Sequence, residues 1–437
     1  MIKNRVVNNA AWIVGCRIVQ SLLNLIVGML TARFLGPGNY GLISYVGSIV
    51  GFFIPLMKLG LNATLVQEIT DDEKNEGKVL GTALGLNIPS GIISIAAAIG
   101  FVFFANKGER ETLAVCAIYS VSLLFQAAEM ITFWYQAKLL SKYPSIAMVI
   151  GYIAVSVYKI FLLVSQKSVL WFAASNALDH LVISTILIVS YIIIGKQRLS
   201  FSFAYAKRML SKSKYYIVSA MMITIFQQTD KLMLKNMIGD EATGFYAAAV
   251  TCAGIFGFVY AAIIDSSLPE ILQNKKISTE KYENSISCVY SIVFYASLVQ
   301  SLATTILAKP MILIMYGEEY MPAVSALRII SWFVTYSYFG CIRNAWILAE
   351  GKHKYVVWID VIGASVNVIL NAILIPVFDI VGAAVASLMT QFFMNLILGF
   401  IMKPLRKNNE LMMRGMNPKF AIEQAKNILS KLGVIKT

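Results

Sequence analysis

Long apolar blocks alternate with short polar connections along the whole chain. Most blocks hold about 20 residues or more, which at about 1.5 Å per residue lets a helix cross a hydrocarbon layer of about 30 Å. The pattern predicts an all-α integral membrane protein of about twelve transmembrane helices. The predicted spans are 8–33, 40–64, 79–105, 111–137, 143–165, 168–195, 214–237, 242–268, 287–307, 321–349, 355–377 and 380–403.

The composition supports lipid as the solvent of this chain. Of its 437 residues, 58% are hydrophobic and 14% are charged. A soluble domain carries about 25% charged residues. The formal charge of +14 would suit a nucleic-acid partner, but the basic residues are scattered over loops and do not gather on one soluble domain. We therefore expect no nucleic-acid partner.

The distribution of Lys and Arg predicts the orientation. With a cytoplasmic N-terminus, 25 of the 37 basic residues fall in cytoplasmic segments, six fall outside and six lie within spans. Cytoplasmic loops carry an excess of Lys and Arg. Both termini are therefore predicted to be cytoplasmic, with an even number of spans. The basic N-terminus leads into a long apolar block without a small-residue cleavage site, so we interpret it as a first span and not a signal peptide.

The sequence contains an internal repeat. Gly36 and Gly41 recur at one common offset as Gly239 and Gly244. A second motif, with Trp134 and Gly151 among its identities, recurs at a slightly longer offset as Trp346 and Gly363. Because six spans separate each motif from its copy, both copies cross the membrane in the same direction. This is the arrangement of a parallel repeat about an axis along the membrane normal. The sequence thus predicts two six-helix lobes, at 1–205 and 206–404.

The segment 405–437 is predicted to be a cytoplasmic tail. Its apolar residues Ala421, Ala425, Ile428 and Leu432 are spaced as on one face of a helix, and lysines lie on other faces. A basic amphipathic helix on the anionic inner leaflet fits this pattern, and a partly disordered basic tail is the alternative.

Cysteine and catalytic patterns point away from enzymes and metal sites. The five cysteines fall inside apolar blocks at no recurring spacing, so neither a disulfide framework nor a zinc site is predicted. The sequence lacks an HExxH, GxSxG or Gly-rich phosphate-loop motif. We expect no catalytic residues, no metal and no bound cofactor.

Ionisable and polar residues form stripes within the predicted spans. Such residues are costly in lipid and tend to face a cavity or a partner. Arg17, Gln20 and Asn24 share one face of the first span, and Glu129 lies within a similar stripe of the fourth. Stripes on at least five helices favour a shared hydrated cavity. Interhelical hydrogen bonds and ion pairs that hold a bundle together are the alternative. The remaining ionisable candidates are Lys159, Asp179, His180, Asp230, Lys231, Arg343 and Asp360.

The motif Ala32-Arg33-Phe34-Leu35-Gly36-Pro37, followed by Tyr40-Gly41, resembles the opening signature of a transporter family. This is the polysaccharide-export and oligosaccharide-flippase branch of the multidrug/oligosaccharidyl-lipid/polysaccharide exporter superfamily, which is MATE-like. Further matches follow in order along nearly the whole chain. They are Asp230-Lys231 before Ile238-Gly239 and Gly244-Phe245-Tyr246, then Tyr316-Gly317-Glu318-Glu319-Tyr320, and last Asn371 through Ile375-Pro376 to Gly382-Ala383-Ala384.

The resemblance implies a flippase with two six-helix lobes and a central cavity exposed alternately to the two leaflets. Its usual cargo is an undecaprenyl-diphosphate-linked oligosaccharide, the repeat unit of an O-antigen or capsule. The other partners implied are membrane lipids and the polysaccharide polymerase and chain-length machinery. The location implied is the bacterial cytoplasmic (inner) membrane, and coupling to Na⁺ or H⁺ stays open.

Within that framework, cations in the cavity would offset the cost of carrying a diphosphate through a low-dielectric layer, and Arg grips phosphate bidentately. The predicted substrate-binding residues are Arg17, Gln20, Asn24, Lys159, Lys231 and Arg343. The predicted coupling-ion or counter-charge residues are Glu129, Asp179 and Asp230.

Three other functions are considered. A multidrug or cation antiporter of the same superfamily would prefer a cavity rich in acids. A lipid II flippase would share the fold. An O-antigen polymerase would need a long outer loop, and every predicted outer loop is short, the longest being 308–320.

Overall fold

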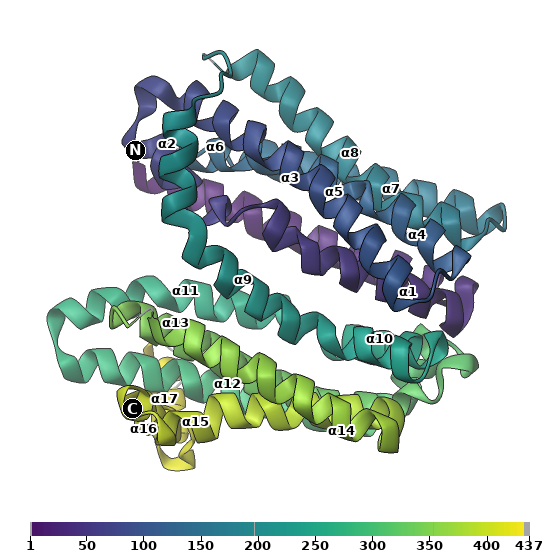
Figure 1. The fold of residues 1–437 in the computed structure, drawn as a ribbon. Helices are drawn as coiled ribbons and strands as arrows, with labels where there is room; N and C mark the ends of the chain where they lie inside the picture. The colour runs from purple at the N-terminus through teal and green to yellow at the C-terminus, as the bar shows by residue number, and fades with distance from the viewer. Residues whose placement is uncertain (1, 196, 353, 432–437) are drawn as a thin grey trace. The chain divides into compact units, whose positions relative to one another are not determined.

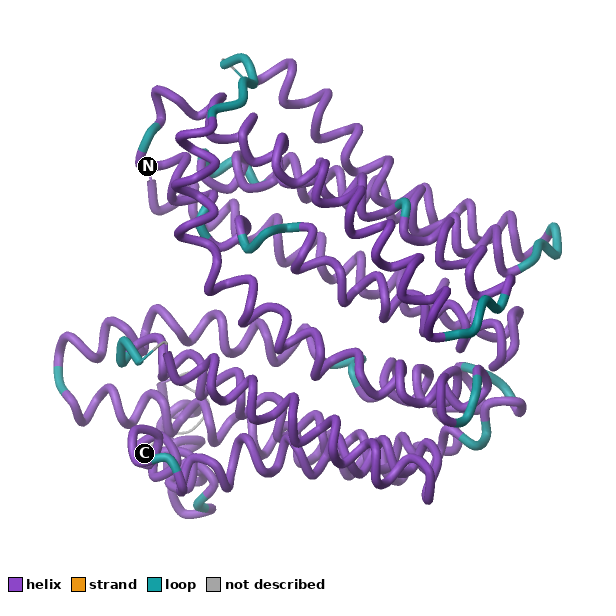
Figure 2. Tube along the Cα trace, in the orientation of Figure 1, coloured by secondary structure: helices purple, strands orange, loops and turns teal. Residues whose placement is uncertain are grey.

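A computed structural model describes residues 2–195, 197–352 and 354–431. Within these ranges every regular element is a helix (Figure 2). The predicted all-α class is confirmed, and each of the twelve predicted segments has a helical counterpart. The chain divides into two compact units, Met1–Gly244 and Phe245–Thr437.

The first unit is built from ten helices, of which α10 runs on past the division between the units (Figure 1). Helix α7 packs against both α1 and α8, while α9 packs along α1. The helices are α1 (Ile2–Met57), α2 (Leu65–Asp71), α3 (Glu76–Ala105), α4 (Arg110–Ser120), α5 (Ser122–Ala128), α6 (Thr132–Ala137), α7 (Lys142–Val164), α8 (Val169–Ile194), α9 (Phe203–Met237) and α10 (Asp240–Ala253). Short 3-10 turns lie at Leu61–Ala63, Glu73–Asn75 and Glu129–Ile131.

In the second unit α12 is the central packing element, in contact with α11, α13 and α16. The helices are α11 (Gly257–Ile277), α12 (Thr279–Met315), α13 (Ala323–Ala349), α14 (Lys354–Phe392), α15 (Leu398–Ile401), α16 (Arg406–Met416) and α17 (Pro418–Lys431). Short 3-10 turns occupy Glu318–Tyr320 and Lys403–Leu405, and a π-helical segment occupies Phe393–Ile397.

The two longest helices each contain a break between two predicted spans. In α1 the break is at Gly36, whose φ of 68° is left-handed, and Pro37 follows without a backbone N–H. In α14 the break is at Asp379, with a φ of 55°, shortly after Pro376. The sequence analysis placed span boundaries at both positions.

Seven stretches of the described chain are long and apolar enough to cross a membrane, and the bent pair α10 and α11 makes an eighth. Two of the seven, Val19–Met57 and Lys354–Ile401, contain the breaks in α1 and α14. Two further predicted spans correspond to α9 and α13, which are long enough but carry more polar residues. The count of twelve crossings stays a prediction.

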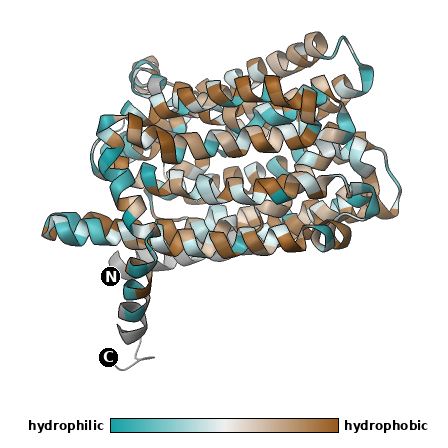
Figure 3. Ribbon diagram, turned by 90° about the horizontal axis from the view of Figure 1, so that it is seen from below, coloured by the Kyte–Doolittle hydropathy of each residue, from teal (hydrophilic) through white to brown (hydrophobic). Residues whose placement is uncertain are grey.

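The helices expose large apolar side chains along their outer faces. On a soluble protein such a contiguous apolar surface would drive association with other molecules. In a membrane the lipid tails cover this surface, so its exposure costs no free energy. Figure 3 shows hydrophobic colour along the helix bodies and hydrophilic colour mainly at their ends. The most exposed large apolar side chains include Ile93, Phe104, Val164, Ile192, Ile193, Ile306 and Ile314.

The backbone supports the internal repeat. Gly36 and its counterpart Gly239 both have positive φ, at 68° and 137°. Leu139 and Gly351, which correspond at the offset of the second motif, also both have positive φ, at 55° and 67°. A left-handed φ at a non-glycine residue such as Leu139 is uncommon. The two halves therefore share turns at positions that the sequence offsets predict.

Two glycines of the first unit, Gly41 and Gly244, are related by the offset of the first motif, and each lies against a residue one helical turn before the other. A Cβ placed on Gly41 would lie 1.8 Å from the Asp240 carbonyl oxygen, and one on Gly244 would lie 2.0 Å from the Pro37 carbonyl oxygen. Residues 37 and 41 are the counterparts of 240 and 244. The contact therefore joins equivalent positions of the two copies of the first motif.

The C-terminal helices α16 and α17 pack against α12. The Tyr290 hydroxyl hydrogen-bonds to Asn408 Oδ1 at 3.0 Å, and the Tyr295 hydroxyl donates to the Met416 carbonyl at 2.9 Å. Helix α17 runs to Lys431 as the tail pattern predicted, although the side chains from 427 onward, including Ile428 and Leu432, lie outside the described residues. The lobe boundary at 205/206 stays a prediction.

Replacing Gly41 or Gly244 by alanine should destabilise the protein. In an open helical site the same change stabilises by up to about 1 kcal/mol, but here the new methyl group meets backbone atoms that cannot move independently. We expect a loss of about 1–3 kcal/mol, as for other overpacked sites. Gly100→Ala is the control, since nothing lies within 4 Å of its added Cβ. Thermal unfolding in detergent measures the effect. A Gly41→Ala midpoint at or above that of Gly100→Ala would refute the contact.

Candidate functional site

Polar side chains of α1 and α7 meet inside the first unit. Gln20 donates a hydrogen bond from Nε2 to the Tyr152 hydroxyl, across 132 positions of sequence. Asn24, one turn further along α1, is exposed. The Arg17 side chain lies outside the described residues, but its backbone is helical and precedes Gln20 by three positions. The stripe predicted on the first span therefore turns at least Gln20 toward α7.

An acid and a histidine form the closest ionisable pair of this region. Glu129 follows α5, and its Oε1 lies 2.8 Å from His180 Nδ1 on α8. Both side chains are about one-fifth exposed. A carboxylate and an imidazole at this distance share one hydrogen, whose position depends on the protonation state of the pair. The contact joins α8 to the segment that follows α5.

Asp179 points away from that pair. Adjacent helical residues lie about 100° apart, and Asp179 accordingly approaches α7, where a Cβ on Gly151 would lie 3.2 Å from Asp179 Oδ1. This oxygen is buried and accepts no hydrogen bond from the part of the chain that the structure describes. Lys159, two turns further along α7, interacts with Asp179 electrostatically. Asp179 and His180, although adjacent in sequence, therefore have different neighbours.

We call Gln20, Glu129, Tyr152, Lys159, Asp179 and His180 the polar cluster. Its ionisable groups are two acids, one lysine and one histidine, and Lys58 at the end of α1 interacts with Glu129. The helices that hold the cluster have apolar outer faces, and ionisable groups among such helices are costly unless they have partners. Among the described residues, no group of three or more His, Cys, Asp or Glu is placed to hold a metal ion.

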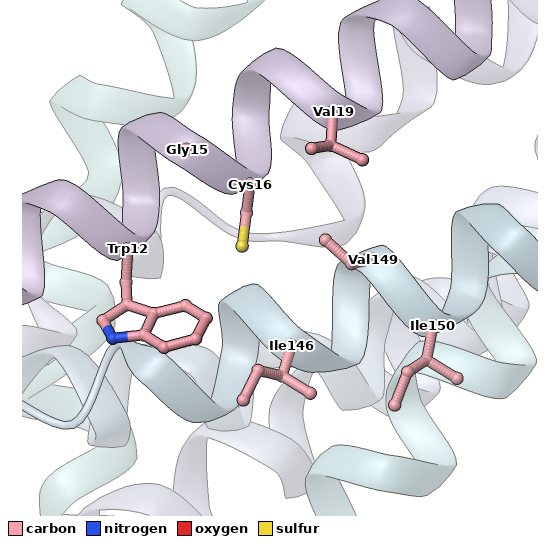
Figure 4. Close-up of a pocket in the computed structure, with 7 residues that line it drawn as sticks. All are labelled: Trp12, Gly15, Cys16, Val19, Ile146, Val149 and Ile150. Carbon is pink, nitrogen blue, oxygen red and sulfur yellow. The ribbon is translucent and has the colours of Figure 1, made fainter.

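An apolar groove runs beside this cluster, between α1 and α7. Its volume is about 520 Å³. Figure 4 shows Trp12 and Cys16 of α1 facing Ile146 and Val149 of α7 across it. The lining is almost entirely hydrocarbon.

The polar residues of α9 are placed differently from one another. Asp230 is buried, and Lys231 beside it is partly buried and interacts with it electrostatically. Lys235 lies near a span end, from which its side chain could reach the membrane surface. In the structure it forms ion pairs with Asp240 and, at 3.3 Å, with Glu109. Lys231 and Asp230 keep their predicted roles as hypotheses.

Arg343 lies in the second unit, between α13 and the π-helical segment. It is 4% exposed, and its Nη1 donates to the Met394 carbonyl at 3.0 Å and to Asn395 Oδ1 at 2.7 Å. A π-helical turn frees backbone carbonyls from the usual pattern. These contacts favour support of the π-helical segment over direct substrate contact as the role of Arg343.

Sequence reasoning missed Tyr152 as a member of the site. Tyr152 and Lys159 are two helical turns apart and therefore lie on one face of α7, which is the signal that could have identified the tyrosine. It also missed the Glu129–His180 pair, because 51 positions separate these two residues. Only the packing of α8 against the segment that follows α5 brings them together.

The comparisons with known proteins agree on one group. Residues 6–275 match the polysaccharide biosynthesis protein family. The chain is 23% identical over 403 residues to the capsular polysaccharide biosynthesis protein CapF of Staphylococcus aureus, covering 88% of this chain and 96% of that one.

Two solved structures share the fold. The lipid II flippase MurJ in an inward closed conformation matches with a TM-score of 0.72 and 14% identity, over 92% of this chain and 90% of that one. An inward-facing multidrug resistance MATE family transporter of the MOP superfamily matches with a TM-score of 0.69 and 16% identity, over 89% and 94%.

The predicted MATE-like fold is thus confirmed. The apolar helices and these similarities together make the chain a multi-pass membrane protein. Because the matched segment covers more than half of its residues, this chain is a member of the polysaccharide biosynthesis protein family.

Proposed function

We propose that this protein is a flippase that moves a polyprenyl-diphosphate-linked oligosaccharide across the bacterial cytoplasmic membrane. The observation that carries the proposal is the similarity to a capsular polysaccharide biosynthesis protein over nearly the full length of both chains. The fold adds support, because it is shared with a lipid II flippase, which also handles a lipid-linked saccharide.

The polar cluster and the neighbouring groove suit the two ends of such a molecule. Lys159 and Arg17 supply positive charge for a diphosphate, and tyrosine, glutamine and asparagine side chains hydrogen-bond to sugar hydroxyls. The apolar groove between α1 and α7 matches the chemistry of the polyprenyl chain. The protein does no covalent chemistry in this proposal. A polysaccharide polymerase and chain-length machinery would use the exported unit.

Two other functions predict different results. A multidrug antiporter would move organic cations, and a lipid II flippase would be required for cell-wall synthesis. Loss of surface polysaccharide in a deletion strain that still grows and keeps its drug tolerance supports the proposal. Loss of viability or of drug tolerance, with normal polysaccharide, would overturn it.

The proposed orientation places both termini in the cytoplasm, as the excess of basic residues on one face indicates. Reporter fusions after Leu210 and after Lys407 should both report the cytoplasm. An outside signal at either fusion would contradict the proposed orientation and the even number of spans.

Removing the proposed phosphate-binding cations should abolish export. A hydrogen bond to a charged group contributes about 1.5–3 kcal/mol, so Arg17→Ala and Lys159→Ala should each lower surface polysaccharide about tenfold or more at normal protein level. Arg17→Lys should restore part of the export, because the charge remains while the bidentate geometry is lost. Lys167→Ala, at an exposed loop position, is the control. Normal export by both alanine variants would reject the assignment.

We further propose that the Glu129–His180 pair couples transport to protons. Glu129→Gln keeps the shape of the side chain but cannot release a proton, so transport into proteoliposomes should no longer respond to an imposed pH gradient. Glu111→Gln, which alters an exposed carboxylate, should keep that response. A Glu129→Gln variant that still responds to the gradient would exclude this pair as the coupling site.

A further inference from the structure

A second polar pocket, separate from the polar cluster, lies within the second unit. Its volume is about 300 Å³, and it is formed where α11, α12, α13 and α16 come together. Trp346 and Tyr282 form aromatic walls, both almost fully buried. Three lysines, Lys275, Lys352 and Lys407, line the same pocket. Nothing in the proposed transport function uses these residues.

Each lysine is held in place by a specific partner. Lys275 Nζ lies 2.8 Å from Glu350, and Lys407 Nζ lies 2.8 Å from Glu283. Lys352 Nζ lies 4.5 Å from the centre of the Trp346 ring and donates to the Pro404 carbonyl at 3.1 Å. An ammonium group has three donors. Lys275 also donates to the Ala349 carbonyl at 2.6 Å and so keeps one donor, while Lys352 and Lys407 keep more. Among the lining residues three ammonium groups face two carboxylates, and the exposed Glu410, outside the lining, lies 3.8 Å from Lys407.

One group of each ion pair has a pKa shifted toward its charged form. Burial raises the pKa of the Glu350 carboxyl, but hydrogen bonds from Lys275 and Tyr282 outweigh burial and hold this pKa below its ordinary value. The hydrogen bond to Glu283 raises the pKa of Lys407. The pairing therefore favours the carboxylate form of Glu350 and the ammonium form of Lys407.

The internal repeat provides a natural comparison for this pocket. At the offset of the second motif, the counterpart of Trp346 is Trp134, that of Glu350 is Lys138, and that of Lys352 is Leu140. Lys138 pairs with Glu76 at 2.8 Å and with Glu73 at 3.4 Å. The first half thus keeps the tryptophan and the ion pair but reverses the charges, with two acids around one lysine. Lys352 thus has a leucine, and not a basic residue, at its counterpart position in the first half.

We propose that the pocket lined by Lys275, Lys352 and Lys407 binds the phosphate of an anionic phospholipid headgroup. Phosphate oxygens accept the donors that the three lysines retain, and a headgroup fits a space of about 300 Å³. With the proposed orientation, the pocket opens at the cytoplasmic ends of its helices, where headgroups of the inner leaflet lie. Basic pockets between helices on this side bind such headgroups. The site is independent of the transported substrate.

Native mass spectrometry of the purified full-length protein tests the proposal, because it counts lipids retained on folded molecules only. The probes are phosphatidylglycerol, phosphatidylcholine and inorganic phosphate. We expect the protein to retain phosphatidylglycerol in preference to phosphatidylcholine. Lys352→Leu, which installs the residue of the first half, should weaken retention about fivefold, the factor that corresponds to about 1 kcal/mol for one basic side chain near a headgroup.

Two controls make the result decisive. Lys309→Leu makes the same chemical change at an exposed position of α12 outside the pocket and should leave retention unchanged. Lys352→Gln, which keeps a hydrogen-bond donor toward Pro404, replaces the leucine variant if that one does not fold. Equal retention by the Lys352 variants and the unaltered protein would overturn the proposal. Competition by inorganic phosphate as effective as that of the lipid would also overturn it, since the site would then serve free phosphate.

Discussion

The cost of leaving a polar group without a partner in hydrocarbon shapes every part of this protein. Backbone groups avoid that cost by forming helices, which is why the chain folds as helices throughout the described ranges. Charged side chains avoid it by pairing inside the bundle. Lys235 pairs with two carboxylates, and Arg343 donates to a carbonyl and an amide. A charged side chain inside the protein therefore needs polar or oppositely charged partners, and the polar cluster provides such partners.

The internal repeat explains how two environments of opposite character arise on one architecture. The contacts of Gly41 with Asp240 and of Gly244 with Pro37 join equivalent positions of the two motif copies. Around that shared frame the side chains have diverged. Beside Trp134 one lysine meets two acids, while beside Trp346 the Lys275–Glu350 pair is joined by a second lysine, Lys352. Duplication thus kept the backbone turns and the buried tryptophan, and changed the charges that a ligand would meet.

The helices were predicted well from the sequence, because a membrane requires apolar segments of about 20 residues and such segments are visible in the sequence itself. The sequence also predicted the breaks at Gly36 and near Asp379, since proline and glycine mark them. It did not predict which polar groups would meet. Gln20 and Tyr152 lie 132 positions apart, and the docking of Asn408 on Tyr290 joins residues 118 positions apart. Such pairs depend on helix rotation and packing, which hydropathy does not encode.

The partners of Arg343 were likewise not predictable from the sequence. As a cation within a span, this arginine has the signature of a substrate contact, yet its partners are the backbone and side chain of the π-helical segment. Burial alone cannot distinguish a binding charge from a supporting one. The Nη1 of Arg343 is occupied by these partners, whereas its Nε is buried and has no hydrogen-bond partner among the described residues. Which donors are occupied is known only when the neighbouring helix is in place, and the predicted substrate contact of Arg343 stays a hypothesis.

The central claim is that this bundle carries a lipid-linked saccharide from one leaflet to the other. The direct measurement reconstitutes the purified protein in liposomes with a labelled undecaprenyl-diphosphate oligosaccharide. A membrane-impermeant sugar oxidant then reports the fraction of saccharide on the outer leaflet over time. The account predicts that the protein accelerates exposure of the saccharide well above the rate in protein-free liposomes. Equal rates with and without protein, together with uptake of an organic cation by the same liposomes, would contradict it.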